Sequence, residues 1–305
     1  MMIFRNFQIK NVQLLLILAF LGVFHLGYSK NNKHIEDLKN KARTFYEQGN
    51  DSAIVLYSEL IEYAQSKQDT LTICYAYSEC FVFAQQMGKV SLSYAYLEKY
   101  KEILPANNDS VYADYYYSLA TFYRHNEIYD NAIENYSQAY QYAKKANLDR
   151  EVLSIANALG LLLIEFKHFE EGLKFLDEVI DKYKQNNDTI YLARAYSNKG
   201  YAYFFMGRFN EGYENYKKAC DLVEEIKPYK YYNYLLGFAD CALEAGKLKE
   251  CDSLNLILEE YVKTTDRVNY KIYFYMNKGR LNVSKNKFTE AEKWLNIALD
   301  MAISG

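Results

Sequence analysis

The chain has 305 residues, of which 50% are hydrophobic and 25% are charged, so it can bury a core and is not disordered by composition. The formal net charge is −3 and no basic stripe occurs, which argues against a nucleic-acid-binding protein. Only 2 prolines and 13 glycines are present, too few for the many tight turns of a β-sandwich, so long helices are expected.

The first 29 residues differ in character from the rest. They contain the basic residues Arg5 and Lys10 and no acidic residue. The stretch from Val12 to Leu26 is almost wholly apolar, but it is shorter than the roughly 20 residues that a membrane-spanning helix needs. A basic start followed by a short apolar stretch is typical of a secretory signal.

Small residues follow the apolar stretch, and Gly27 and Ser29 have the spacing of a cleavage site. We therefore predict a signal peptide at 1–29, with an uncleaved N-terminal membrane anchor as the alternative. The remaining residues, 30–305, form the predicted repeat domain. Export to the periplasm or cell envelope is the expected location, with membrane contact only through an uncleaved 1–29 segment.

A short motif then recurs seven times with a period of 39 or 40 residues. It is clearest at Met206–Gly212 and returns at Lys285–Ala291 and Phe166–Gly172. The small residue that ends each copy stands at 53, 93, 132, 172, 212, 251 and 291. Apolar residues on both sides follow the i, i+3, i+4 spacing of amphipathic helices. Each copy therefore predicts two antiparallel helices joined by a short turn.

Most copies carry a second small residue 12 positions before the first, as in Gly200 and Gly212. Glycine inside a helix costs about 1 kcal/mol relative to alanine. Its repeated use predicts that the two helices of a hairpin approach closely at these positions. We also expect the aromatic residue of the motif, such as Phe209 or Phe288, to fill the corner of its hairpin.

At this point the residues resemble the tetratricopeptide repeat. That motif has small residues at positions 8, 20 and 27 and a large apolar residue at position 24. Gly200, Gly212, Ala219 and Tyr216 occupy these positions in the fifth copy. Pro105 falls at position 32 of the second copy, where the family often has proline. The resemblance covers about 35–303.

The resemblance implies an all-α fold, a right-handed α-solenoid of about seven helical hairpins, with a concave groove that binds a protein or peptide and no catalysis. Two departures matter. The period exceeds the family's usual 34 residues, which implies longer helices or longer turns. In the second copy Phe81 stands where a small residue is expected, so we predict a local distortion there.

In the family, positions 2, 5, 9 and 12 of the first helix face the groove. Carried over to this sequence, they predict a peptide-binding groove formed by Tyr117, Thr121, Arg124, Asn157, Arg194, Ser197, Tyr201, Phe204, Asn233 and Asp240. Aromatic and apolar side chains with a few Arg and Asn suit a peptide or helix better than a charged metabolite. The alternative is that this face is only solvated. Most of the 33 tyrosines are expected in the core, including those at position 24: Tyr57, Tyr136 and Tyr216.

Signals for catalysis are nearly absent. No phosphate-binding loop, nucleophile elbow or zinc-protease motif occurs, so we predict no enzyme, no metal and no cofactor. His125 and His168 lie near hairpin corners and are expected at the surface. The five cysteines form no C-x-x-C motif and are expected as buried hydrophobes, with a Cys241–Cys251 disulfide as the alternative.

Triplets of Asp, then Ser or Thr, then an apolar residue recur in the turns between repeats, at Thr70, Ser110 and Thr189. Two interpretations are open. The polar residues are natural N-caps of the next helix, which is the favoured hypothesis. The triplets also resemble the O-glycosylation acceptors of exported Bacteroidetes proteins, which would make these three hydroxyls modification sites.

The last predicted hairpin ends in the apolar residues Leu299, Met301, Ala302 and Ile303 instead of the polar cap that a solenoid normally has. Two functional hypotheses follow. The chain is a non-enzymatic protein- or peptide-binding scaffold of the cell envelope. Alternatively, it is the periplasmic sensory input module of a longer signalling or transcription-regulatory protein, since it is similar to the sensor portions of Bacteroidetes tetratricopeptide signalling proteins. Neither hypothesis requires a nucleic acid or a small-molecule substrate.

Overall fold

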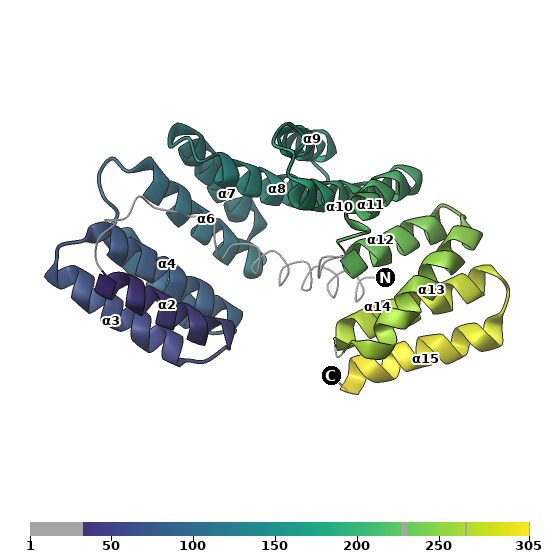
Figure 1. The fold of residues 1–305 in the computed structure, drawn as a ribbon. Coiled ribbons are helices and arrows are strands. Elements are labelled where there is room, and N and C mark those ends of the chain that lie inside the picture. Colours follow the sequence, from purple (N-terminus) through teal and green to yellow (C-terminus); the bar gives the residue numbers. More distant parts are fainter. Residues whose placement is uncertain (1–32, 227–230, 266, 305) are drawn as a thin grey trace. The chain divides into compact units, whose positions relative to one another are not determined.

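The computed structural model describes residues 33–226, 231–265 and 267–304, and in these ranges every regular element is an α-helix (Figure 1). The predicted signal segment 1–29 and Pro228 lie outside them. The first helices of the hairpins are α2 (Lys33–Glu47), α4 (Thr70–Gln86), α6 (Asp109–His125), α8 (Asp149–Glu165), α10 (Thr189–Phe205), α12 (Tyr231–Glu244) and α14 (Val268–Ser284). The second helices are α3 (Ser52–Ser66), α5 (Val90–Glu102), α7 (Tyr129–Lys145), α9 (Phe169–Gln185), α11 (Phe209–Val223), α13 (Leu248–Thr264) and α15 (Phe288–Ser304).

These helices explain the long period of the repeat. From α6 to α9 each helix has 17 residues, and only short turns separate them, at 126–128, 146–148 and 166–168. Two such helices with two three-residue turns make up the 40-residue period. Longer helices, not longer turns, therefore distinguish this repeat from the usual one. Two connections are longer than four residues: 103–108 after α5, where Pro105 lies at the predicted repeat boundary, and 224–230 after α11.

Most of the described three- and four-residue turns share one geometry, the Schellman motif. At the end of α10 the Gly207 N–H donates to the Phe204 carbonyl at 3.0 Å, and the Arg208 N–H donates to the Tyr203 carbonyl at 2.8 Å. Gly207 has a φ of +76°, in the left-handed region that glycine adopts without strain. Lys167 occupies the same place one repeat earlier with a φ of +67°. The second residue of the recurring motif is thus the left-handed residue that ends the helix in both turns.

Small residues inside the hairpins meet their neighbours closely, as predicted. A Cβ added to Gly200 would lie 2.7 Å from the Tyr216 ring, and one added to Gly172 would lie 2.6 Å from the Gly160 carbonyl oxygen. The three tyrosines at position 24 are buried, with exposed fractions of 0% for Tyr57, 2% for Tyr136 and 7% for Tyr216, which confirms their place in the core.

The corner prediction holds for some hairpins only. Phe209 packs edge-on against Phe204, with ring centroids 5.5 Å apart. Phe288, however, is 64% exposed, so the expectation was wrong for the last hairpin. All five cysteines are buried and unpaired, which confirms them as small hydrophobes and contradicts the Cys241–Cys251 disulfide.

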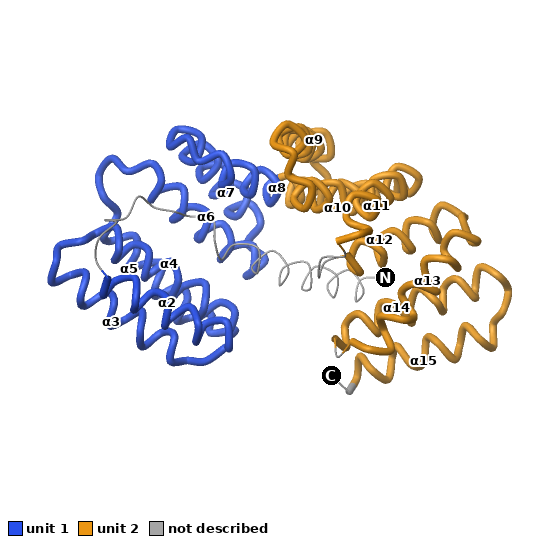
Figure 2. The backbone as a smooth tube through the Cα atoms, viewed as in Figure 1, with its two compact units in different colours: residues 1–159 blue, residues 160–305 orange. Residues whose placement is uncertain are grey.

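The chain divides into two compact units, residues 1–159 and 160–305 (Figure 2). In each unit the first helices of successive hairpins contact one another: α4 contacts α6 in unit 1, while α10 contacts α12 and α12 contacts α14 in unit 2. Second helices also pack on the first helix of the next hairpin, as α3 does on α4 and α11 does on α12. Among the described residues, no helix is long and apolar enough to cross a membrane.

Candidate functional site: the first-helix face of unit 2

Six of the ten predicted groove residues lie in unit 2. All six side chains are half-buried: Arg194, Ser197, Tyr201 and Phe204 on α10, and Asn233 and Asp240 on α12. The steps of three, four and seven residues between them place each set on one face of its helix. Because α10 and α12 contact each other, the two sets belong to neighbouring rows. We call these six residues the unit-2 face.

The α10 row combines a fixed cation with aromatic rings. The Arg194 guanidinium lies 4.8 Å from the centroid of the Tyr191 ring and hydrogen-bonds Tyr183. Burial raises the pKa of Tyr183, and the nearby Arg194 charge opposes that rise. Tyr201 packs toward Phe205 with ring centroids 6.1 Å apart. The row therefore offers a positive charge at one end and apolar rings at the other.

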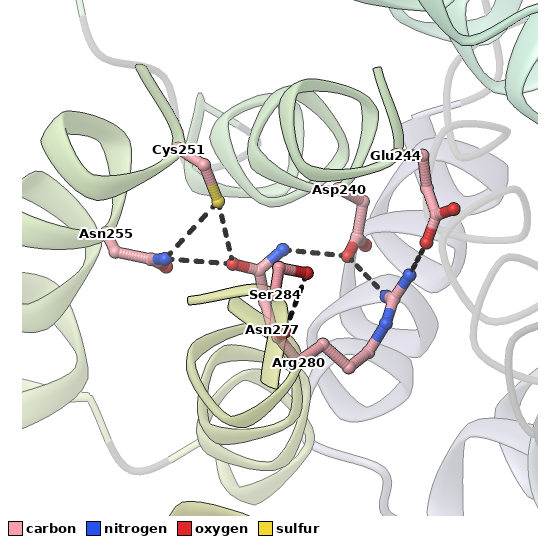
Figure 3. A network of polar contacts seen from close by, with 7 residues as sticks. All are labelled: Asp240, Glu244, Cys251, Asn255, Asn277, Arg280 and Ser284. Atoms are coloured by element: carbon pink, nitrogen blue, oxygen red, sulfur yellow. Dashed lines mark hydrogen bonds and ion pairs between the residues drawn. The ribbon is translucent and has the colours of Figure 1, made fainter. Parts of the chain in front are cut away.

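The α12 row joins a polar network with α13 and α14 (Figure 3). Asn277 donates from Nδ2 to Asp240 Oδ1 at 2.9 Å, and Arg280 donates from Nη1 to the same oxygen at 3.1 Å. A second nitrogen of Arg280, Nη2, binds Glu244. On the other side, Asn255 donates to Asn277 Oδ1 at 2.9 Å. One buried amide thus connects the last two hairpins.

The charges of this network do not cancel. Two carboxylates, Asp240 and Glu244, share the single guanidinium of Arg280. Burial raises the pKa of Asp240, while Arg280 and the Asn277 hydrogen bond oppose the rise. The α12 row therefore carries more acceptors than its cation neutralises, which suits an N–H donor or a cation.

Arg280 and Asn277 are site residues that were missed in the sequence. Arg280 is 40 residues after Asp240 and occupies the same repeat position, position 9 of the first helix. Opposite charges at one repeat position in successive copies predict an inter-repeat ion pair, because the first helices lie side by side. This signal was available in the sequence.

The other four predicted groove residues lie in unit 1, where Thr121 is half-buried and the other three are buried. Arg124, Asn157 and Tyr117 are 3%, 4% and 9% exposed. Tyr117 packs edge-on against Tyr136 with centroids 5.4 Å apart, and its carbonyl accepts a 2.8 Å hydrogen bond from the Thr121 hydroxyl. Groove binding at these positions stays a prediction, and three of the four side chains offer little surface.

Unit 1 also contains an acidic pair. The Tyr100 hydroxyl donates to Asp114 Oδ2 at 2.8 Å, and the Tyr57 hydroxyl donates to Glu79 Oε2 at 3.2 Å. Burial raises the pKa of Asp114 to about 6 and that of Glu79 to about 7. Glu79 was not predicted, although it is the only charged residue of α4, which was a usable signal.

The two histidines near hairpin corners differ. His168 is exposed, as predicted. His125 is half-buried, which corrects the expectation that it lies at the surface. Burial and the adjacent Arg124 charge lower the pKa of His125 to about 4. His125 is half-buried because it is the last residue of the 17-residue helix α6. The next three residues form the corner of the hairpin.

The turn triplets act as helix caps at two of the three sites. Asp69 accepts a hydrogen bond from the Thr72 N–H, and Asp188 accepts one from the Tyr191 N–H. At the third site the cap is Asn108, whose Oδ1 also accepts from the Ser110 hydroxyl at 2.7 Å. Thr70 and Thr189 are exposed and Ser110 is half-buried. O-glycosylation at these residues stays a prediction.

Comparison with known proteins agrees with this architecture. The family model described as tetratricopeptide repeat matches residues 193–223, which cover most of α10 and all of α11. No curated protein matches the sequence.

Solved structures share the fold at low identity. A signal-transduction ATPase with a tetratricopeptide repeat sensor from Pyrococcus horikoshii is 16% identical over 87% of this chain and 40% of its own, with a TM-score of 0.71. Aspartyl phosphate phosphatase F from Bacillus subtilis is 15% identical over 86% and 68%, with a TM-score of 0.63. A Rap protein complexed with competence and sporulation factor is 13% identical over 89% and 98%, with a TM-score of 0.58.

The chain spans less than half of the ATPase, so only the fold of that protein is compared. Several observations agree on a helical-repeat fold. They are the helical hairpins, the small residues at matched positions, the family match at 193–223 and the similar solved structures. Residues 193–223 match the tetratricopeptide repeat, and the described chain is an all-α array of helical hairpins that is similar in fold to a protein with a tetratricopeptide repeat sensor.

Proposed function

We propose that the chain is a non-enzymatic scaffold that binds a protein or peptide partner on its unit-2 face. The observation that carries this proposal is the half-buried state of all six side chains on two contacting helices. The neighbours of a half-buried side chain hold it in place, and its remaining solvent-accessible surface can contact a partner. The Rap protein, whose structure holds competence and sporulation factor, supports the proposal by sharing the fold.

The chemistry of the unit-2 face favours a polypeptide over a metabolite. Tyr201 and Phe204 supply apolar area, and aromatic residues and arginine dominate the energy of protein interfaces. Arg194 can donate to a carbonyl or carboxylate, and Asp240 can accept from an N–H group. A peptide offers both kinds of group along its backbone, spaced over several residues.

We place the scaffold in the cell envelope, on the strength of the basic and apolar character of residues 1–29. Fractionation of cells that produce the full chain tests this location. Recovery in the cytoplasm with residues 1–29 intact would contradict it.

A sensory input module is the second candidate, and the Pyrococcus ATPase favours it, because its tetratricopeptide sensor is part of a longer signalling chain. Both candidates use the same binding face. A membrane helix and an output domain encoded directly after Gly305 would support the sensory role.

Site-specific photo-crosslinking in the native cells tests the binding face. A photoreactive phenylalanine analogue replaces Ser197 on α10 in one variant and Leu256 on α13 in the control. Leu256 is 67% exposed but lies on a second helix, away from the unit-2 face. We expect an adduct of defined mass from position 197 only. Equal adducts from both positions, or none from 197, would overturn the proposal.

A further inference from the structure

One charged side chain lies at the interface between the first hairpin, α2 and α3, and the following helix α4. Glu79 is the only charged residue of α4, and its Oε2 accepts a 3.2 Å hydrogen bond from the Tyr57 hydroxyl of α3. Arg43 and Tyr46 of α2 and Tyr75 of α4 interact with the same carboxyl group. Tyr46, Tyr57 and Tyr75 are 4%, 0% and 9% exposed. We call these five residues the Glu79 cluster.

The charges around Glu79 do not balance when its carboxyl group ionises. Arg43 attracts the carboxylate, but its side chain is exposed, so water screens its charge. The Asp114 carboxyl group of α6 acts on Glu79 with the opposite sign. Lys39 of α2 reaches the cluster, where its Nζ lies 4.9 Å from an aromatic ring centroid, but it also pairs with Glu36 at 3.1 Å. An enclosed carboxylate with one hydrated cation and a like charge nearby is costly.

The other titratable groups around Glu79 stay neutral. Burial raises the pKa of the three cluster tyrosines, and it raises the pKa of Cys80 on α4 to about 12. On α5 the Tyr100 hydroxyl donates to Asp114 at 2.8 Å. Burial also raises the pKa of Glu79 itself to about 7, while the Tyr57 hydrogen bond opposes the rise and the Asp114 charge adds to it. The carboxyl group of Glu79 therefore changes its charge near neutral pH.

The contacts next to Glu79 join the first hairpin to α4 through aromatic rings. Tyr46 meets Phe83 of α4 with ring centroids 5.3 Å apart, and Tyr57 meets Tyr75 at 6.3 Å. Among the described residues, the buried Tyr46 hydroxyl has no hydrogen-bond partner, and such a group lowers stability. The first hairpin thus packs on α4 around one polar cluster that is incompletely paired and changes charge.

We propose that protonated Glu79 holds the first hairpin on α4 and that ionisation of Glu79 weakens this interface. The neutral carboxyl group places no uncompensated charge among the tyrosines, whereas the carboxylate needs water, which enters when the hairpin separates from α4. The folded pKa lies above the 4.5 of an ordinary glutamate, so this stabilisation is complete below pH 4.5 and is lost as pH rises through 7. The Glu79 cluster belongs to unit 1, so the inference does not depend on the binding proposed for the unit-2 face.

Hydrogen exchange with mass spectrometry of the full chain at pH 6 and pH 8 tests the proposal, with labelling times scaled for the intrinsic exchange rate at each pH. In wild type, peptides from α2 and α3 are expected to exchange about tenfold faster at pH 8 after scaling, which is the effect of one group whose pKa rises from 4.5 to about 7 on folding. Peptides from α12 to α14 should change little. Glu79→Gln is expected to remove the difference. Glu59→Gln, at an exposed position of α3, should keep it.

Arg43→Gln provides a second test that does not depend on the folding of Glu79→Gln, because the Arg43 side chain is exposed. Since Arg43 lowers the pKa of Glu79, its removal should move the midpoint of the exchange change to higher pH in a series from pH 5 to pH 9. Lys41→Gln, also exposed on α2, is the control and should leave the midpoint in place.

Circular dichroism of each variant shows whether it is folded. Equal scaled exchange of α2 and α3 at pH 6 and pH 8 in wild type would overturn the proposal. So would a folded Glu79→Gln variant that keeps the full difference, or the same midpoint for Arg43→Gln and Lys41→Gln.

Discussion

At the scale of single residues, Gly200 shows how a missing Cβ sets the spacing of a hairpin. The Tyr216 ring occupies the space that a side chain at this position would need. Gly200→Leu should therefore destabilise the chain by about 1–3 kcal/mol through overpacking. Urea denaturation followed by circular dichroism measures the change. Glu214→Leu, at an exposed position of α11, is the control and should shift the midpoint little. An equal shift for both variants would contradict the hairpin packing.

Glu79 provides a residue-scale prediction about pH. Its folded pKa of about 7 lies above the 4.5 of an ordinary glutamate side chain, so the folded state holds the proton more strongly than the unfolded state. The stability that this proton provides is present below pH 4.5 and is lost as pH rises through 7. Glu79→Gln cannot ionise, so its stability relative to wild type should increase between pH 5 and pH 8.

Denaturation midpoints at pH 5, 6, 7 and 8 test this. Glu59→Gln on α3, where the side chain is exposed, serves as the control and should follow wild type. His125 has a lowered pKa, so its contribution to stability changes with pH in the direction opposite to that of Glu79. Because wild type and Glu79→Gln both contain His125, this contribution cancels when the two proteins are compared. Parallel curves for Glu79→Gln and wild type would show that Glu79 does not titrate in this range.

At the scale of elements, equivalent turns place different residue types in the same left-handed conformation. Lys167 and Gly207 occupy the same place in turns one repeat apart, with φ values of +67° and +76°. A left-handed conformation costs a non-glycine residue roughly 1–2 kcal/mol. Lys167→Gly should therefore stabilise the chain by up to about 1 kcal/mol, and Gly207→Lys should destabilise it by a similar amount. Thermal unfolding of the two variants and of the double swap measures both signs. Shifts of the same sign would contradict the shared turn geometry.

The helices and turns were predictable because their signals are local. The spacing of apolar residues, the small pairs and the turn motif all act within one hairpin, and the structure places helices and turns accordingly. Burial depth was not predictable in the same way. Arg124 and Asn157 occupy repeat positions that face the groove in the family. Their exposed fractions, however, depend on the residues from other helices that pack over them. The Asp240–Arg280 pair spans 40 residues, and it is predictable only when the opposite charges at one repeat position are combined with the side-by-side packing of α12 and α14.

At the scale of the whole molecule, stability should be distributed as in a linear array, since each hairpin contacts mainly its neighbours. Leu258 on α13 is 0% exposed, and truncation of a buried leucine to alanine costs about 2–5 kcal/mol. We therefore expect Leu258→Ala to weaken α12, α13 and α14 while leaving α2 to α5 unchanged. Hydrogen exchange with mass spectrometry locates the effect by peptide.

The exposed neighbour Leu256→Ala is the matched control for that experiment, because it removes the same atoms from the surface of the same helix. It should leave exchange in α2 to α5 and in α12 to α14 nearly as in wild type. The decisive comparison is between the two compact units, since α13 belongs to residues 160–305 and α2 to α5 belong to residues 1–159. If Leu258→Ala accelerated exchange equally in both, the chain would unfold as one cooperative body and the nearest-neighbour description of the array would be wrong.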